Sequence, residues 1–196
     1  MTTSLLTPPG RGCADEYVPF ENVDTRNDLQ ALIEVPILCR TLRLPRGVRV
    51  LGVGCGRGIA LPVLWARLAP SSLTAIDSDA ELARVARLRS IKEKLKVRVT
   101  EGDVRSMPYE DASFDLVIDF GTCYHVSGGV VGARRALREI SRVLAPGGLF
   151  VHETPAAQHL AHPVRSFGRT LPWNDVPSLA FERTAVLWTR RRRIAA

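Results

Sequence analysis

Residues 50–58 read Val-Leu-Gly-Val-Gly-Cys-Gly-Arg-Gly, a run of strand-forming residues that ends in closely spaced glycines. We expect a strand over 48–54, and a helical pattern resumes from Ile59 to Leu68. Glycines between a strand and a helix let the backbone turn sharply and approach a ligand, and the first turn of the helix offers free N–H groups. The stretch therefore predicts either a ligand-binding loop or a plain tight turn.

The spacing of these glycines separates two kinds of nucleotide site. The nicotinamide fingerprint is G-x-G-x-x-G, but its sixth position is Arg57 when counted from Gly52 and Ile59 when counted from Gly54. The shorter pattern G-x-G-x-G fits fully from Gly54 to Gly58. This spacing argues against a nicotinamide-dependent oxidoreductase.

Strands and helices are expected to alternate on both sides of this loop. Asp24 or Thr25 opens a helical segment that Pro36 should kink or split. We expect further strands at 73–76, 97–100, 114–118 and 149–152, terminal strands at 178–183 and 184–190, and helices at 78–94 and 133–144. Such alternation predicts an α/β, doubly wound, Rossmann-like fold with a mostly parallel sheet covered on both faces.

Acidic residues follow two of the predicted strands. In parallel sheets, ligands bind beyond the carboxyl ends of the strands. Asp77 ends the second strand and can accept hydrogen bonds from both hydroxyls of a ribose. Asp103 follows the third strand and is either an acceptor for the amine of an adenine or a turn residue. Ser78 to Glu81 fits a capping box, although Asp79 is a second candidate for the helix cap.

Length and composition indicate one ordinary globular domain. The chain has 196 residues, of which 45% are hydrophobic and 24% charged. We expect a mobile N-terminal arm or lid at 1–23 and a single domain at 24–196. No apolar stretch approaches the ~18 residues of a membrane span. The four cysteines form no C-x-x-C pair, and none has metal-site spacing with a histidine, which favours a reduced, cytoplasmic protein without a metal site. We expect a monomer or a homodimer.

Basic residues exceed acidic ones, and the formal net charge is +7. The excess comes from 24 arginines against three lysines, which suggests coding bias. Basic clusters lie at 84–96 and 190–193. One interpretation is that 84–96 is a solvated helix face and 190–193 a terminal tail. The other is that both clusters contact nucleic acid.

The order of these motifs resembles class I S-adenosylmethionine-dependent methyltransferases, in their small-molecule, type 11-like form. The matching strings are 50–58, 74–77, 101–109, 113–118 and 136–150. The resemblance implies a seven-stranded sheet with an antiparallel last strand. It also implies S-adenosyl-L-methionine as cofactor and S-adenosyl-L-homocysteine as product.

The resemblance also assigns roles to individual positions. Gly54, Cys55 and Gly56 would pass beside the methionine part of the cofactor, and the other cofactor-binding positions would be Asp77, Ser78, Asp103, Val104, Asp119, Phe120 and Gly121. Gly52 departs from the family, which usually has an acid here that helps to position the methionine ammonium group.

Methyl transfer to a hydroxyl needs alignment and a general base. His125 is the first candidate for the base, and Tyr124 could bond the acceptor or pack on the cofactor. His152 and Glu153 follow the fifth predicted strand and are expected to face the same site. Segments 13–35 and 154–177 would shape the acceptor pocket.

The sequence thus predicts a methyltransferase for a small organic acceptor, most simply at oxygen. An RNA methyltransferase and an inactive cofactor-binding subunit remain as alternatives. The first rests on the basic clusters and the second on Gly52.

Overall fold

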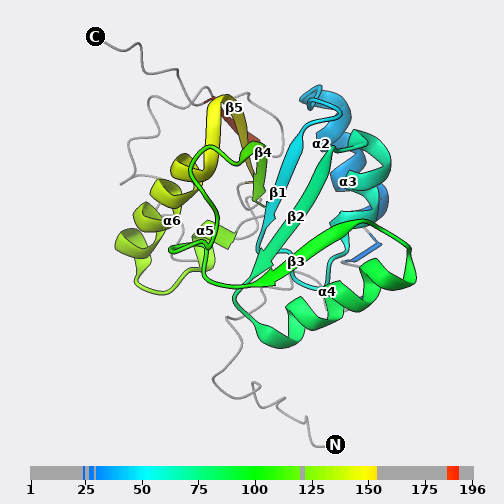
Figure 1. The fold of residues 1–196 in the computed structure, drawn as a ribbon, viewed down its shortest axis with the longest axis horizontal. Helices are drawn as coiled ribbons and strands as arrows, with labels where there is room; N and C mark the ends of the chain where they lie inside the picture. The colour runs from blue at the N-terminus through cyan, green and yellow to red at the C-terminus, as the bar shows by residue number, and fades with distance from the viewer. Residues whose placement is uncertain (1–23, 25–26, 29, 120–121, 154–184, 190–196) are drawn as a thin grey trace, which may run out of the picture.

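The computed structural model describes residues 24, 27–28, 30–119, 122–153 and 185–189. These residues form one six-stranded sheet with helices on both faces, as Figure 1 shows. The strand order is β3-β2-β1-β4-β5-β6. Neighbouring strands pair in parallel from β3 through β2, β1 and β4 to β5, and β6 runs antiparallel to β5. This arrangement confirms the doubly wound fold and its antiparallel last strand. The strand predicted at 178–183, which would complete seven, lies outside the described residues.

The strands follow the predicted positions closely. They are β1 (Arg49–Val53), β2 (Ser72–Asp77), β3 (Val97–Glu101), β4 (Phe114–Asp119), β5 (Leu144–Glu153) and β6 (Ala185–Thr189). Strand β4 is almost entirely buried, as expected for a central strand covered on both faces.

The helices complete the crossovers. They are the π-helical turn η1 (Gln30–Glu34), α2 (Val35–Thr41), α3 (Ala60–Leu68), α4 (Ala80–Lys92), α5 (Thr122–His125) and α6 (Gly129–Val143). Pro36 lies in the first turn of α2, where the π-helical turn η1 changes to α-helix, and the two elements follow each other without a break. Within the described part of the chain, no helix combines the length and the apolar character needed to cross a bilayer.

Two apolar layers hold the sheet between its helices. On one face, Leu61 and Leu64 of α3 pack with Val50 of β1 and Ala86 of α4. On the other face, Ile140 of α6 belongs to a second cluster that contains Leu51, Val117 and Phe150 from three neighbouring strands, together with Met107 from the β3–β4 loop. Alternate side chains of β1 therefore serve opposite layers.

Two boundaries differ from the sequence prediction. Helix α6 begins at Gly129, one turn before the predicted Ala133, because Gly128 adopts a left-handed conformation (φ +88°) immediately before it. Strand β5 begins at Leu144, before the predicted start at residue 149, because Leu144 pairs with Phe114 across a register shift.

The order of the strands reverses between β1 and β4. Strands β2 and β3 lie to one side of β1, and β4 and β5 lie to the other. Ligands of such sheets bind at this switch, beyond the carboxyl ends of the strands. The loop after β1, the end of β2 and helix α5 all lie at this edge (Figure 1).

Candidate functional site

The glycine loop after β1 is bound to the neighbouring strand and touched by α5. The backbone N–H groups of Gly54 and Cys55 both donate to the carbonyl of Ile76, at 2.8 and 3.1 Å. Gly54 has φ +63°, and a Cβ atom placed there would lie 1.6 Å from Oγ1 of Thr122. Glycine at this position is therefore required both by the backbone conformation and by the close approach of α5.

Asp77 connects the glycine loop to the start of α4. Its Oδ2 accepts a hydrogen bond from the backbone N–H of Gly56 at 2.7 Å, and its Oδ1 accepts one from Asp79 at 3.0 Å. Asp77 lies at the end of β2 and is partly exposed. Each carboxylate oxygen has two lone pairs, so Asp77 has acceptor capacity left for a ligand beyond these two bonds.

Asp79 is the N-cap of α4. Its Oδ1 accepts from the backbone N–H groups of Glu81 at 2.9 Å and Leu82 at 3.0 Å. The capping box expected at Ser78 is therefore wrong, and the second candidate for the cap is confirmed. Ser78 lies between Asp77 and the cap residue Asp79.

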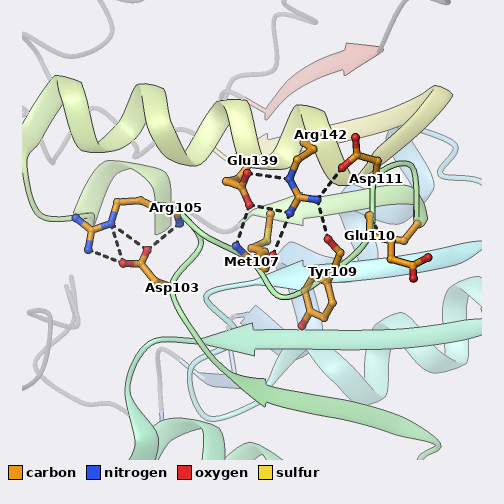
Figure 2. Close-up of polar contacts among 9 residues, drawn as sticks. Asp103, Arg105, Met107, Tyr109, Glu110, Asp111, Glu139 and Arg142 are labelled. Carbon is orange, nitrogen blue, oxygen red and sulfur yellow. Dashed lines mark hydrogen bonds and ion pairs between the residues drawn. The ribbon is translucent and has the colours of Figure 1, made fainter.

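Asp103 is engaged by a neighbouring arginine. Arg105 folds back on it, with its Nη2 at 2.5 Å from Oδ2, and its backbone N–H donates to Oδ1 at 2.7 Å (Figure 2). Hydrogen bonds from Arg105 lower the pKa of Asp103. Nη1 of Arg105 also donates to the carbonyl and to Oγ of Ser127, at 2.9 and 2.7 Å. Asp103 is thus an ionised acceptor whose lone pairs are already partly used.

Arg142 fastens the loop that carries Asp103 to α6. Nε and Nη2 of Arg142 each bond to Glu139 at 2.8 Å, and Nη1 bonds to Asp111 at 2.9 Å. Arg142 also donates to the carbonyls of Met107 and Tyr109, while the N–H of Met107 donates to Glu139 (Figure 2). The second half of the β3–β4 loop, from Met107 to Asp111, is therefore attached to α6.

Asp119 and His152 form a buried polar pair beyond the switch point. Their side chains have no exposed surface, and Oδ2 of Asp119 lies 2.7 Å from Nδ1 of His152. His152 lies inside β5 rather than after it, so the expectation that it follows the strand and faces the site is wrong.

The other predicted site residues divide between the core and the part of the chain that is not described. Val104 is buried in the core beside Met107. Tyr124 and His125 belong to helix α5. The side chains of Tyr124, His125 and Glu153, and all of Phe120, Gly121 and the predicted acceptor segment 154–177, lie outside the described structure. Their roles stay predictions.

Two cysteines near the site are held as neutral thiols. Burial, together with the charge of Asp77, raises the pKa of Cys55 to about 12. Burial, together with the charge of Asp119, raises the pKa of Cys123 well above its ordinary value. Neither thiol is an effective nucleophile near neutral pH, because the thiolate is the reactive form.

Two residues that sequence reasoning missed take part in the site. Thr122 fills the space above Gly54, and Arg105 bridges Asp103 to Ser127. Both lie within segments that the sequence analysis singled out. Gly54 and Ser127 are distant from them in the chain and become their neighbours only in the folded protein, so no local pattern pointed to these contacts.

Comparison with known proteins adds a family and several relatives. The family described as "Methyltransferase domain" matches residues 51–152. A ubiquinone biosynthesis O-methyltransferase of Xanthomonas axonopodis pv. citri (strain 306) is 40% identical over 139 residues, which cover 68% of this chain and 56% of that protein. A homologous protein of Xanthomonas oryzae pv. oryzae (strain PXO99A) is 39% identical, over 59% of this chain and 48% of the relative. The chain thus spans about half the length of the curated relatives it matches.

Solved structures agree on the fold. A SAM-dependent methyltransferase from Aquifex aeolicus superposes with a TM-score of 0.63 at 18% identity, over 83% of this chain and 93% of that one. The [4+2]-cyclase SpnF superposes with a TM-score of 0.54 at 30% identity, over 61% and 43% of the two chains. Similar chains therefore carry the names of different reactions.

Proposed function

Because the chain belongs to the methyltransferase-domain family, we propose that it transfers a methyl group from S-adenosylmethionine to an oxygen atom of a small organic acceptor. One observation carries the proposal most directly. The carboxylate of Asp77 bonds to the N–H of Gly56, so that an acid suited to a ribose lies against a glycine-rich turn at the switch point.

The residues present fit the nucleoside part of this cofactor. Asp77 retains lone pairs for the ribose hydroxyls, and its carboxylate lies against the backbone N–H of Gly56 in the glycine loop. Asp103 would accept from the adenine amine beside its bonds to Arg105. The other proposed cofactor contacts are Ser78, Phe120, Gly121 and, because their side chains are buried, only the backbone of Val104 and Asp119.

The expected binding site for the methionine part of the cofactor lacks an acid that the family usually has. Gly52 replaces the acid that is usual in the family, and no heavy atom of the described residues lies within 4 Å of the place where its Cβ would be. The ammonium group of the cofactor would therefore depend on backbone carbonyls and on Cys55 and Gly56 for its position. We expect binding that is carried mainly by the nucleoside.

The cofactor supplies an activated methyl group on a positively charged sulfur. The chain's own task is to hold the acceptor in line with that group and to exclude water. An acceptor hydroxyl loses its proton during the transfer, and we assign this proton to His125 as general base, with Tyr124 orienting the acceptor. Cys55 and Cys123 do not compete as methyl acceptors, because both thiols stay neutral.

The acceptor class rests on the relatives. The curated relatives are O-methyltransferases of ubiquinone biosynthesis, which supports oxygen in a small molecule as the target atom. Segment 154–177 would line the acceptor side. We place the reaction in the cytoplasm and expect a monomer or a homodimer.

A transfer assay with labelled methyl groups tests this function. The protein is incubated with methyl-labelled S-adenosylmethionine and a panel of hydroxylated small molecules, then with a cell extract, and the product is identified by its mass. We expect label on an oxygen of a small molecule. We also expect His125→Ala to lower turnover by roughly 10²- to 10⁴-fold while binding of S-adenosylhomocysteine persists.

Two outcomes would overturn the proposal, and a third would change its mechanism. Label in RNA, with binding that weakens steeply as salt rises, would favour the RNA methyltransferase. Cofactor binding without label in any acceptor would favour an inactive subunit or a different reaction, as the similar [4+2]-cyclase illustrates. Full activity of His125→Ala would remove this residue from the mechanism.

A further inference from the structure

The fully buried pair Asp119–His152 needs an explanation that the cofactor contacts do not give. The two residues are register partners at the ends of β4 and β5, and neither has any exposed side-chain surface. An isolated charge is costly to bury unless it is paired and hydrogen-bonded. The carboxylate of Asp119 meets this condition through the bonds described next.

The protonation of the pair follows from its geometry. Burial alone would raise the pKa of Asp119, but attraction to His152 and hydrogen bonds from His152 and Cys123 together lower it. Asp119 is therefore a carboxylate, which can only accept. Nδ1 of His152, at 2.7 Å, must then carry the proton of this hydrogen bond.

The same carboxylate holds the start of α5. Its Oδ1 accepts from the backbone N–H of Thr122 at 2.6 Å, and its Oδ2 accepts from that of Cys123 at 3.3 Å. Thr122 in turn donates through Oγ1 to the carbonyl of Val53 at 3.2 Å and covers Gly54. One acid thus joins the ends of three strands, β1, β4 and β5, through the first residue of α5.

We propose that Asp119 and His152 are a positioning pair that fixes α5 against the glycine loop. Because α5 continues into Tyr124 and His125, the pair would set where these two residues meet the acceptor. His152 would act through Asp119 and would not touch the acceptor, which agrees with its complete burial. The catalytic consequence rests on the proposed function, whereas the effect on α5 does not.

Two amide replacements of His152 test the pair. The amide nitrogen of an asparagine can take the position of Nδ1, whereas that of a glutamine reaches the position of Nε2. We expect His152→Asn to keep kcat within about threefold of the wild type. We expect His152→Gln to lower kcat by about 100-fold, the scale of a displacement near 1 Å, with KM for the cofactor changed by less than about threefold.

Leu64→Ala is the matched control for lost stability. Leu64 is buried in α3 on the opposite face of the sheet, so its truncation should lower the unfolding temperature without lowering kcat in the cold. A second readout is amide hydrogen exchange at Thr122 and Cys123. We expect it to be at least tenfold faster in His152→Gln than in the wild type, and unchanged in His152→Asn and Leu64→Ala.

The outcomes separate the two proposals. If the wild type labels no acceptor, the proposed function fails, and the exchange rates still decide whether the pair holds α5. If His152→Gln and His152→Asn exchange alike at α5, the positioning pair is refuted. The same holds if α5 loosens in His152→Gln while kcat stays that of the wild type.

Discussion

At the scale of single residues, two glycines of one motif differ in whether they tolerate a side chain. Gly54 has φ +63°, and a Cβ there would overlap Thr122, whereas Gly52 lies in regular strand with no heavy atom of the described residues within 4 Å of its missing Cβ. The sequence marks Gly52 as a departure from the family but does not show that Gly54 excludes a side chain. Only the folded arrangement of α5 distinguishes them.

We therefore predict unequal effects of two alanine substitutions. Gly54→Ala should lower the free energy of unfolding by at least about 2 kcal/mol, through backbone strain and overlap with Thr122. Gly52→Ala should raise it by about 0.4–1 kcal/mol, because alanine restricts the unfolded chain without strain in the strand. Urea unfolding of both variants measures the difference, and equal effects would contradict the described contact of α5 with the loop.

At the scale of elements, the sequence predicted most strands and helices because their apolar patterns are local. The strand over 114–118 is an example, since four of its five residues are apolar and all of them lie within β4. Features that depend on distant pairing were missed. Leu144 enters β5 only through its pairing with Phe114, and no local signal joins Arg142 to the loop at 107–111.

The hydrogen bonds between α6 and the β3–β4 loop predict that the free energy of unfolding depends on pH. Hydrogen bonds from Arg142 hold the pKa of Glu139 below its ordinary value of 4.5 in the folded chain. The unfolded chain therefore binds more protons in this range, and the stabilisation is present above pH 4.5 and lost as pH falls through the folded pKa.

Glu139→Gln should reduce the loss of stability at acid pH. We expect the free energy of unfolding, measured by urea titration from pH 6 down to about pH 3, to fall less steeply in the variant than in the wild type. Glu110→Gln, an exposed acid of the same loop, is the control and should keep the wild-type slope. Parallel curves for all three proteins would show that Glu139 does not contribute.

At the scale of the whole molecule, the strand order brings the ends of β1, β2 and β4 to one edge. The sequence predicted the cofactor side of this edge well, because the glycine loop and Asp77 follow their strands directly. It predicted the acceptor side only as segments without a pattern. The buried pair of Asp119 and His152 was also beyond it, because 33 residues separate the two along the chain.

The central claim is that this edge binds an adenosine through Asp77. Titration calorimetry with S-adenosylhomocysteine tests it most directly, in the wild type, in Asp77→Ala and in the exposed control Glu110→Ala. We predict that Asp77→Ala weakens binding by about 1–3 kcal/mol, since ribose hydroxyls lose their acceptor, while Glu110→Ala binds as the wild type does. Equal affinity of all three proteins, or no binding to the wild type, would contradict the account.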